Sequence, residues 1–215
     1  MKICGTTSEE DALLAVAMGA DALGFIFAPS PRQIAPSLTA DIVKRLPPEV
    51  VTVGVFRDES PKRVVEVVNR CGLKGAQLHG HETPEQATWI RQRVPFTIQA
   101  FPAGDRAVRN ALNYHADIVL VDSPKPGSGQ VFDWSLAAEA PRSVRLMLAG
   151  GLHADNVADA IAQVRPWGVD VVTGVEQSPG RKDARKVRAF ITAAKEAEVP
   201  AYEGGEDLPF DWEEL

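Results

Sequence analysis

Short runs of apolar and β-branched residues alternate with longer amphipathic segments along nearly the whole chain. Such runs are typical of buried strands, and the longer segments are typical of helices that cover them. The expected strands span residues 2–4, 22–27, 50–56, 75–79, 96–101, 117–122, 145–150 and 169–174. The expected helices span residues 8–18, 39–46, 60–71, 84–93, 104–114, 133–140, 154–164 and 183–197.

Residues at the ends of the expected helices support these bounds. Ser8 stands where a side chain can cap the first turn, and Pro61 and Pro84 occupy first helical positions. Gly19 and Gly72 follow helical runs, where a left-handed cap is easiest for glycine.

Eight strands in strict alternation with eight helices predict a parallel sheet closed into a (β/α)8 TIM barrel. The alternative is an open doubly wound sheet. It is disfavoured because no GxGxxG follows the first strand and no shift in composition marks a second lobe. We therefore expect one α/β catalytic domain over residues 1–200.

Charge is unevenly placed along the chain. The 215 residues are 45% hydrophobic and 24% charged, as in an ordinary globular protein, with a net charge of −6. Residues 201–215 contain six acids and no Lys or Arg, so residues 1–200 carry 23 acidic and 23 basic side chains. We interpret 201–215 as an acidic C-terminal extension rather than a domain. The balance also argues against nucleic acid as a partner, because such binders show a basic patch.

Other features of the sequence bear on location. Glu9, Glu10 and Asp11 interrupt any apolar run near the N-terminus. No stretch approaches the roughly 20 apolar residues of a membrane span, so no membrane partner is expected. Cys4 and Cys71 lack CxxC spacing, which disfavours a disulfide. The expected location is cytoplasmic.

Active groups of a (β/α)8 barrel gather where its strands end and the following loops begin. Cys4 ends the first expected strand, Arg32 lies in the loop after the second, His79 ends the fourth and Asp122 ends the sixth. Each has an ordinary alternative: Cys4 as apolar packing, Asp122 as an acceptor of backbone amides, and Arg32 as a solvated loop residue rather than a clamp for a carboxylate.

Glycines mark the ends of the seventh and eighth expected strands. Gly150 and Gly151 follow one strand, and Thr173 and Gly174 end the next. Glycine lets backbone N–H groups approach an anion, and these loops are the usual phosphate position in such barrels. The pattern predicts a phosphate site there.

Several other residues invite a chemical interpretation. His79 and His81 have the spacing of some metal ligands, but no group of carboxylates accompanies them, so we expect no metal site. Cys71 is expected to be packed at a helix end. Lys2 and Asp170 start strands that become neighbours when the barrel closes, which suggests either an internal ion pair or a contact from Asp170 to a ligand.

Taken together and in order, the strand ends resemble the phosphoribosylanthranilate isomerase family. The resemblance rests on seven motifs: "KICG" (2–5), "GFIFAPSPRQI" (24–34), "VGVF" (53–56), "QLHG" (77–80), "VDS" (121–123) with "GSGQVFDW" (127–134), "LAGGL" (148–152) with "NV" (156–157), and "GVDVVTGVEQSPGRKD" (168–183). It covers residues 2 to about 192, and seven motifs in register make it specific.

The resemblance implies a cofactor-free Amadori rearrangement of phosphoribosylanthranilate, a small phosphosugar substrate, into an open-chain 1-deoxyribulose phosphate. It implies that Cys4 is the general base and Asp122 the general acid. It assigns Arg32 to the anthranilate carboxylate, and His79 and Asp170 to the substrate site with roles left open. Gly150, Gly151, Thr173 and Gly174 match the phosphate site.

Two departures from the family pattern occur, the loop "PGSGQ" and Thr173 in place of a common serine. Alternatives also remain. A histidine-pathway isomerase of the same reaction type, or an enzyme using both substrates, is one; the histidine-pathway relative has an aspartate at the position of Cys4. A non-catalytic phosphosugar-binding paralogue is another, expected to lack Cys4 or Asp122. Phe210 and Trp212 suggest a partner-binding tail or a frayed terminus, and a monomer and a homodimer are both compatible with the sequence.

Overall fold

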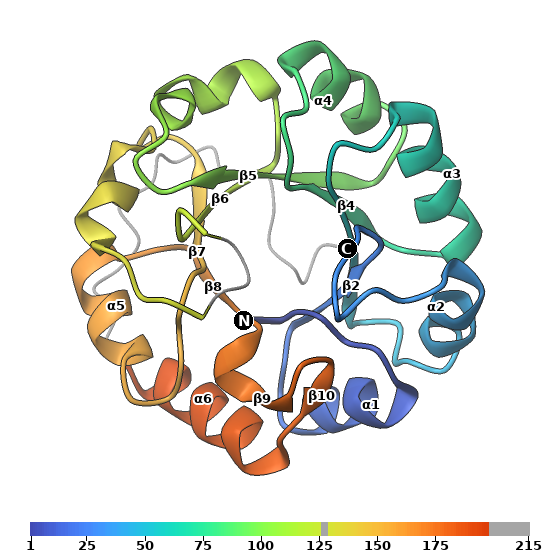
Figure 1. Ribbon diagram of the computed structural model, residues 1–215, viewed down its shortest axis with the longest axis vertical. Helices are drawn as coiled ribbons and strands as arrows, with labels where there is room; N and C mark the ends of the chain where they lie inside the picture. The colour runs from blue at the N-terminus through green and yellow to red at the C-terminus, as the bar shows by residue number, and fades with distance from the viewer. Residues whose placement is uncertain (126–128, 198–215) are drawn as a thin grey trace.

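Eight parallel strands close into a barrel in the computed structural model, which describes residues 1–125 and 129–197. The strands follow one another around the ring in chain order, and β1 pairs with β8 to close it (Figure 1). The predicted fold class is confirmed. The strands are β1 (Lys2–Ile3), β2 (Ala22–Ile26), β3 (Val51–Phe56), β4 (Gly75–Leu78), β5 (Phe96–Pro102), β6 (Ile118–Asp122), β7 (Arg145–Leu148) and β8 (Gly168–Val171).

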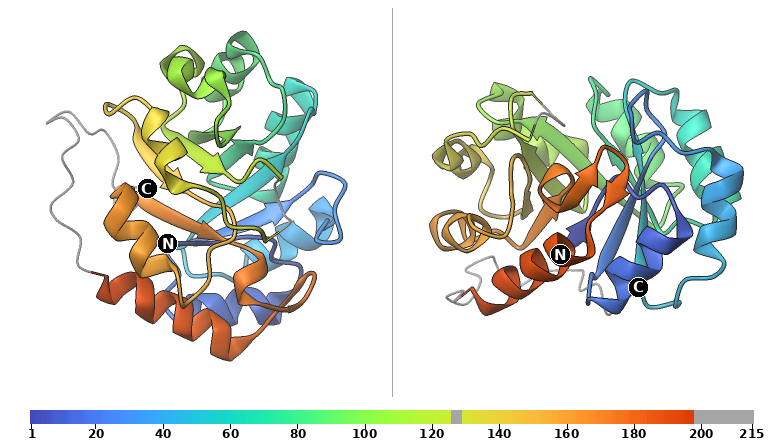
Figure 2. Two further views of the ribbon diagram at one scale, coloured as in Figure 1. Left: turned by 60° about the vertical axis from the view of Figure 1, so that its left-hand side comes forward. Right: turned by 60° about the horizontal axis from the view of Figure 1, so that its bottom comes forward.

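Helices surround the ring of strands on the outside, and α6 lies beside α1 where the chain comes full circle (Figures 1 and 2). Ser8 caps α1 and Thr83 forms a capping box on α4, as their sequence positions predict. The helices are α1 (Glu9–Ala17), α2 (Pro36–Val43), α3 (Pro61–Cys71), α4 (Pro84–Arg91), η1 (Arg106–Tyr114), η2 (Trp134–Glu139), α5 (Val157–Val164) and α6 (Ala184–Glu196).

The connections after β5 and β6 are helical, as expected over 104–114 and 133–140. Both η1 and η2 are 3₁₀ helices. Each begins with an aspartate, Asp105 or Asp133, whose side chain accepts from the backbone N–H two residues on. In α1 and α4 the cap accepts from the residue three positions on, and in α6 the cap Asp183 accepts from both positions.

Strand side chains alternate between two apolar regions. One side packs against the helices. The other fills the inside of the barrel with ten residues: Ala22, Val51, Val53, Phe96, Ile98, Ala100, Ile118, Leu120, Met147 and Ala149. Lys2, Gln77 and Asp170 are buried polar residues on the same side of their strands as this inner group. Arg145 on β7 is also buried on this side, in register with Ile118 of the inner group. The inside of the barrel is therefore apolar over most of its ring and polar where β1, β4, β7 and β8 contribute these residues.

The chain after β8 departs from the expected strand over 169–174. Thr173 and Gly174 lie in the short 3₁₀ helix η3 (Thr173–Val175). A Cβ on Gly174 would lie 2.0 Å from the carbonyl oxygen of Leu152, so this turn packs directly on the backbone that follows β7. The chain then forms a two-stranded hairpin of β9 (Glu176–Ser178) and β10 (Arg181–Lys182), which returns over the first strand end.

No helix within the described ranges is long and apolar enough to cross a membrane. The acidic extension predicted for 201–215, with Phe210 and Trp212, lies outside the described residues. The domain boundary near residue 200 therefore stays a prediction.

Candidate active site

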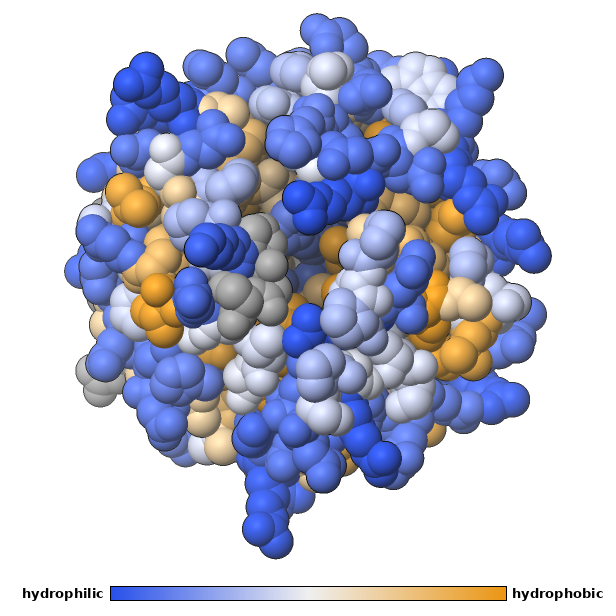
Figure 3. All heavy atoms as spheres, viewed as in Figure 1, coloured by the Kyte–Doolittle hydropathy of each residue, from blue (hydrophilic) through white to orange (hydrophobic). Residues whose placement is uncertain are grey.

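A cavity of about 360 Å³ opens where the barrel strands end. The space-filling view shows a hollow over the middle of the ring (Figure 3). Five of the predicted site residues line this cavity, and each comes from a different part of the chain: Cys4, Arg32, His79, Asp122 and Asp170. Gln77, from the same strand as His79, lines it as well. The structure thus brings together the groups that the strand-end argument selected.

Cys4 forms part of the cavity wall and is only 3% exposed. Burial, the largest influence, raises the pKa of the Cys4 thiol; Lys2 and Lys182 oppose this rise, and Asp170 adds to it. Space for the sulfur comes from Gly24 on β2, because a Cβ there would lie 2.5 Å from Cys4 Sγ. Cys4 is therefore an enclosed thiol between two lysines, with no side chain facing it from β2.

The ion pair suggested between Lys2 and Asp170 is present. Lys2 Nζ lies 2.9 Å from Asp170 Oδ1, and the two residues are paired in register across β1 and β8. Burial disfavours the charge on Lys2, but Asp170 and Cys4 outweigh it and raise the pKa of Lys2. Asp170 also lines the cavity, so the pair and a ligand contact are compatible.

His79 and Asp122 lie next to each other on the wall of the cavity. His79 Nε2 lies 3.4 Å from Asp122 Oδ2, although the two atoms are not aligned as a hydrogen bond. The other carboxylate oxygen, Oδ1, accepts from the backbone N–H of Ser123 at 2.7 Å. Asp122 therefore does bind a backbone amide, and its second oxygen is still directed at His79 within the cavity.

Arg32 reaches the cavity but is already engaged. Its Nε and Nη2 donate to the carboxylate of Glu176 at 2.8–3.0 Å in a buried two-point contact. Lys182 Nζ lies 3.2 Å from the same carboxylate and donates to the carbonyl oxygen of Cys4 at 2.5 Å. Burial disfavours the Glu176 charge, but Arg32 and Lys182 outweigh it and hold the pKa of Glu176 below its usual range. The β9–β10 hairpin thus fixes Arg32 from one side, and within residues 1–125 and 129–197 its Nη1 makes no hydrogen bond.

A small recess of about 30 Å³ lies beside the main cavity, where β6, β7 and β8 end. Gly150, Gly151 and Thr173 line it, as the phosphate prediction requires, and Asp122 and Asp170 border both spaces. Gly150 and Gly151 have positive φ angles of 87° and 66°, which L side chains rarely adopt. A Cβ on Gly150 would lie 2.9 Å from Phe132 Cε1, and one on Gly151 would lie 2.5 Å from the backbone of Val131, so the segment after β6 packs closely on both glycines.

Three residues singled out in the sequence lie elsewhere. Gly174 does not line the recess; its lack of a side chain is explained by the contact with Leu152. His81 is exposed and its Nδ1 lies 3.2 Å from Asp58, so the two histidines of "HGH" do not converge. Cys71 is packed at the end of α3, as expected, with Sγ 3.2 Å from the carbonyl oxygen of Pro36. Within residues 1–125 and 129–197 no three His, Cys, Asp or Glu side chains group around a possible metal ion.

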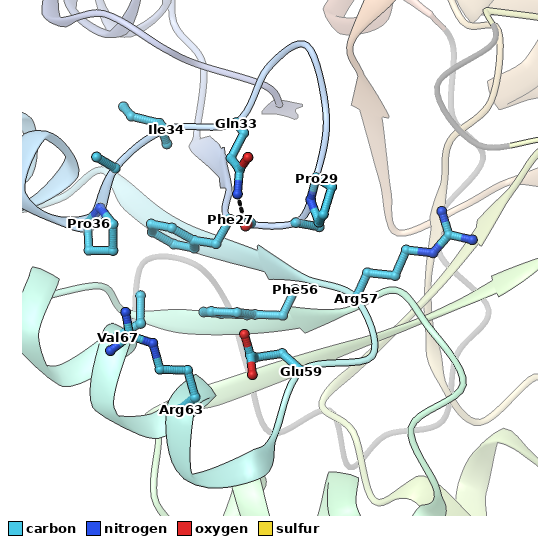
Figure 4. Close-up of a pocket in the computed structure, with 12 residues that line it drawn as sticks. Phe27, Pro29, Gln33, Ile34, Pro36, Phe56, Arg57, Glu59, Arg63 and Val67 are labelled. Atoms are coloured by element: carbon cyan, nitrogen blue, oxygen red, sulfur yellow. Dashed lines mark hydrogen bonds between the residues drawn. The ribbon is translucent and has the colours of Figure 1, made fainter.

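A second groove, about 520 Å³, lies outside the barrel mouth between α2 and α3. Its apolar wall is the stacked pair Phe27 and Phe56, with ring centroids 5.2 Å apart (Figure 4). Arg63 at its edge is paired with Glu66. The groove holds neither of the predicted acid–base residues, so the chemistry is assigned to the barrel mouth.

Four residues of the site were not among the sequence predictions: Gly24, Gln77, Glu176 and Lys182. Gln77 shares a strand face with His79, a signal that was readable from the alternation of β4. Glu176 and Lys182 stand in "GVEQSPGRKD", but only the hairpin geometry shows that they turn back onto Arg32 and Cys4.

Comparison with known sequences gives one consistent family. A profile described as N-(5'phosphoribosyl)anthranilate (PRA) isomerase matches residues 1–193. The N-(5'-phosphoribosyl)anthranilate isomerase of Desulforudis audaxviator (strain MP104C) is 48% identical over 204 residues, which is 92% of this chain and 98% of that protein.

Comparison with solved structures agrees. The phosphoribosyl anthranilate isomerase of Thermus thermophilus matches with a TM-score of 0.85 and 41% identity, over 90% of this chain and 97% of that one. A phosphoribosyl anthranilate isomerase in complex with reduced 1-(o-carboxyphenylamino)-1-deoxyribulose 5-phosphate matches with a TM-score of 0.80 and 41% identity, over the same shares.

Proposed function

Because this chain belongs to the phosphoribosylanthranilate isomerase family, we propose that it converts N-(5-phosphoribosyl)anthranilate to 1-(2-carboxyphenylamino)-1-deoxyribulose 5-phosphate in tryptophan biosynthesis. The observation that carries the proposal is the shared cavity of Cys4 and Asp122, a thiol and a carboxyl group from opposite parts of the barrel. A relative with 41% identity binds the reduced form of this product. The reaction moves protons and needs no cofactor.

The first step is ring opening, for which Asp122 is the proposed general acid. Protonated Asp122 gives its proton to the ring oxygen of the ribose as the bond between that oxygen and the anomeric carbon breaks. The amine nitrogen supplies the electron pair and becomes an iminium. The Ser123 N–H that binds Oδ1 also stabilises the carboxylate left behind.

The second step is proton removal, for which Cys4 is the proposed general base. The thiolate takes the proton from the carbon next to the iminium carbon, and the resulting enolamine rearranges to the ketone. Because burial raises the pKa of Cys4, the thiol depends on Lys2 and Lys182 to offset part of that effect. An enclosed thiolate is also poorly hydrated, which makes it a stronger base toward a carbon acid.

Substrate orientation follows from the two flanks of the cavity. The free edge of Arg32, at Nη1, is the proposed donor to the anthranilate carboxylate, with Glu176 fixing the plane of the guanidinium. The phosphate is assigned to the recess at Gly150, Gly151 and Thr173. The sugar then bridges Cys4 and Asp122.

Complementation tests the substrate. The gene is expected to restore growth of a tryptophan auxotroph lacking this isomerase, and Cys4→Ala and Asp122→Asn are expected to abolish rescue while the proteins remain folded. A histidine auxotroph run in parallel distinguishes the related isomerase; growth of that strain alone contradicts the substrate assignment. Retention of both Cys4 and Asp122 disfavours a non-catalytic phosphosugar-binding paralogue. Cytoplasmic location and the choice between monomer and homodimer stay predictions, checked by cell fractionation and light scattering.

A further inference from the structure

A chain of side-chain contacts begins at Lys2, buried inside the barrel, and continues along the wall of the cavity. Lys2 Nζ lies 2.8 Å from Gln77 Oε1, and Gln77 Nε2 lies 2.9 Å from His79 Nδ1. His79 Nε2 then lies 3.4 Å from Asp122 Oδ2. The four residues come from β1, β4, the end of β4 and β6, so the chain links opposite walls of the barrel.

The direction of every hydrogen bond in this chain is fixed by its first member. A lysine ammonium has three donors and no acceptor, so the Gln77 atom that faces Lys2 must be its carbonyl oxygen. The other end of the amide is then the NH₂ group, which donates to His79 Nδ1. A ring nitrogen that accepts a hydrogen bond carries no proton, so the neutral His79 ring carries its proton on Nε2.

We propose that Lys2 and Gln77 are positioning residues that hold His79 in the tautomer with its proton on Nε2, the ring nitrogen that lies beside Asp122 Oδ2. His79 is then neither a general base nor a metal ligand at Nε2; its hydrogen serves the carboxylate of the general acid. The catalytic part of this inference rests on the proposed function of Asp122, whereas the tautomer of His79 follows from the contacts alone.

The length of the last contact gives His79 a role during the reaction. At 3.4 Å and without alignment, the Nε2–H holds Asp122 weakly, so Oδ2 remains able to carry the proton that ring opening requires. Once that proton leaves, the oxygen becomes fully charged and the contact is expected to shorten. A donor that binds the product state of proton transfer more strongly than the starting state lowers the barrier.

The ammonium of Lys2 keeps the Gln77 amide, and with it the direction of these hydrogen bonds, from reversing. A flipped Gln77 amide would direct its NH₂ group at Lys2, placing donor against donor, while its oxygen would face His79. Lys2 is held in place by Asp170 at 2.9 Å and is fully buried, so no water replaces it as a partner. The ion pair across β1 and β8 is thus the fixed end of the chain.

Nuclear magnetic resonance of the histidine rings tests the tautomer without any substrate. Long-range ¹H–¹⁵N spectra of the wild-type protein are expected to show His79 with a protonated Nε2 and an unprotonated Nδ1. The signals of the four histidines are separated by comparison with His79→Gln. A protonated Nδ1 on the neutral His79 ring would overturn the proposal.

Gln77→Glu replaces the NH₂ group that faces His79 Nδ1 with a carboxylate oxygen, and the size of the side chain hardly changes. A carboxylate at position 77 is acceptor-only, so His79 must present a proton at Nδ1. At a pH where the spectra show the ring neutral, the expected result is a shift of His79 to the Nδ1–H tautomer, which leaves no proton on Nε2, with kcat reduced about 10- to 100-fold by loss of an oriented charge-assisted hydrogen bond. KM is expected to stay within about twofold, since Gln77 orients His79 rather than holding substrate.

Gln99→Glu is the matched control. Gln99 is also a buried barrel glutamine, but its Nε2 faces the carbonyl oxygens of Leu78 and Ala100 rather than a histidine. It is expected to leave the His79 tautomer unchanged. If either glutamate variant fails to fold, Gln77→Leu removes the donor to Nδ1 without a charge, and a mixture of His79 tautomers with a lower kcat is expected.

The two claims fail in different ways. If the wild-type protein does not isomerise phosphoribosylanthranilate, the proposed function is wrong, while the ring spectra still decide the tautomer. If the spectra change in Gln77→Glu and kcat does not, the positioning role is wrong although the enzyme assignment stands. A change in both for Gln77→Glu and in neither for Gln99→Glu supports the inference.

Discussion

Gly24→Ala tests whether the missing side chain on β2 sets the position of the Cys4 thiol. A Cβ at residue 24 would lie 2.5 Å from Cys4 Sγ, 3.1 Å from Cys4 Cβ and 3.2 Å from Cys4 Cα. Non-bonded heavy atoms in good contact lie about 3.5–4.0 Å apart, so the sulfur has to move by about 1 Å or the two strands have to separate. Gly24 has no positive φ, so the change acts through contact and not through backbone strain.

The size of the effect follows from two opposing contributions. Overpacking a barrel interior costs about 1–3 kcal/mol, and loss of glycine freedom in the unfolded chain offsets about 0.4–1 kcal/mol of this. We expect the free energy of unfolding to fall by about 1–2 kcal/mol. A displacement of about 1 Å at a reacting atom lowers the rate by up to about 100-fold, so kcat is expected to fall far more than stability alone explains.

Urea unfolding and steady-state isomerase kinetics measure the two effects, and Gly168→Ala is the control. Gly168 is also a strand glycine without positive φ, but its added Cβ would meet only Met147 Cε at an ordinary 3.5 Å. That variant is expected to keep wild-type kcat. Adding Cys4→Ala to Gly24→Ala removes the 2.5 Å contact and is expected to recover part of the lost stability. Wild-type stability and kcat in Gly24→Ala would refute the reasoning.

Three further predictions concern the charged groups. Because burial raises the pKa of Cys4 and the base must be deprotonated, kcat/KM is expected to rise with pH through and above neutrality; a plateau from pH 7 contradicts this. Lys2→Met leaves Asp170 buried without its cation and is expected to cost about 3–5 kcal/mol in urea unfolding, with partial recovery in Lys2→Met/Asp170→Asn. Glu176→Gln weakens the hold on Arg32 and is expected to raise KM about tenfold while kcat changes little; an unchanged KM removes Glu176 from substrate orientation.

The barrel was predictable because its evidence is local and repeated. Each strand is a short apolar run, each helix has its own start and stop, and closure follows from eight such units. The pair of Lys2 and Asp170 was also predictable, although 168 residues separate them, because barrel closure makes β1 and β8 neighbours. Positions fixed by strand order can be worked out from sequence.

Contacts made by loops that turn back were not predictable in the same way. Arg32 is separated from Glu176 by 144 residues, and their contact depends on the reversal at β9–β10, for which strand order gives no rule. The expected helices at 104–114 and 133–140 are present as 3₁₀ helices, a distinction from α-helices that an amphipathic pattern does not make. The need for glycine at position 24 appears only once Cys4 Sγ is placed opposite it.

The contacts that run from the Lys2–Asp170 pair through Gln77 are better explained by the orientation they give His79 than by a contribution to stability. A buried ion pair such as Lys2–Asp170 stabilises a fold little compared with apolar side chains of similar volume, because both charges lose their hydration. Ten apolar residues fill most of the barrel interior, so the same space could have been filled that way. What apolar packing cannot supply is a donor of fixed direction. Through Gln77 the pair sets the tautomer of His79 beside Asp122. The same ammonium opposes the rise in the pKa of Cys4 that burial causes. One lysine therefore acts on both proposed proton-transfer groups, which accounts for its place at the start of β1.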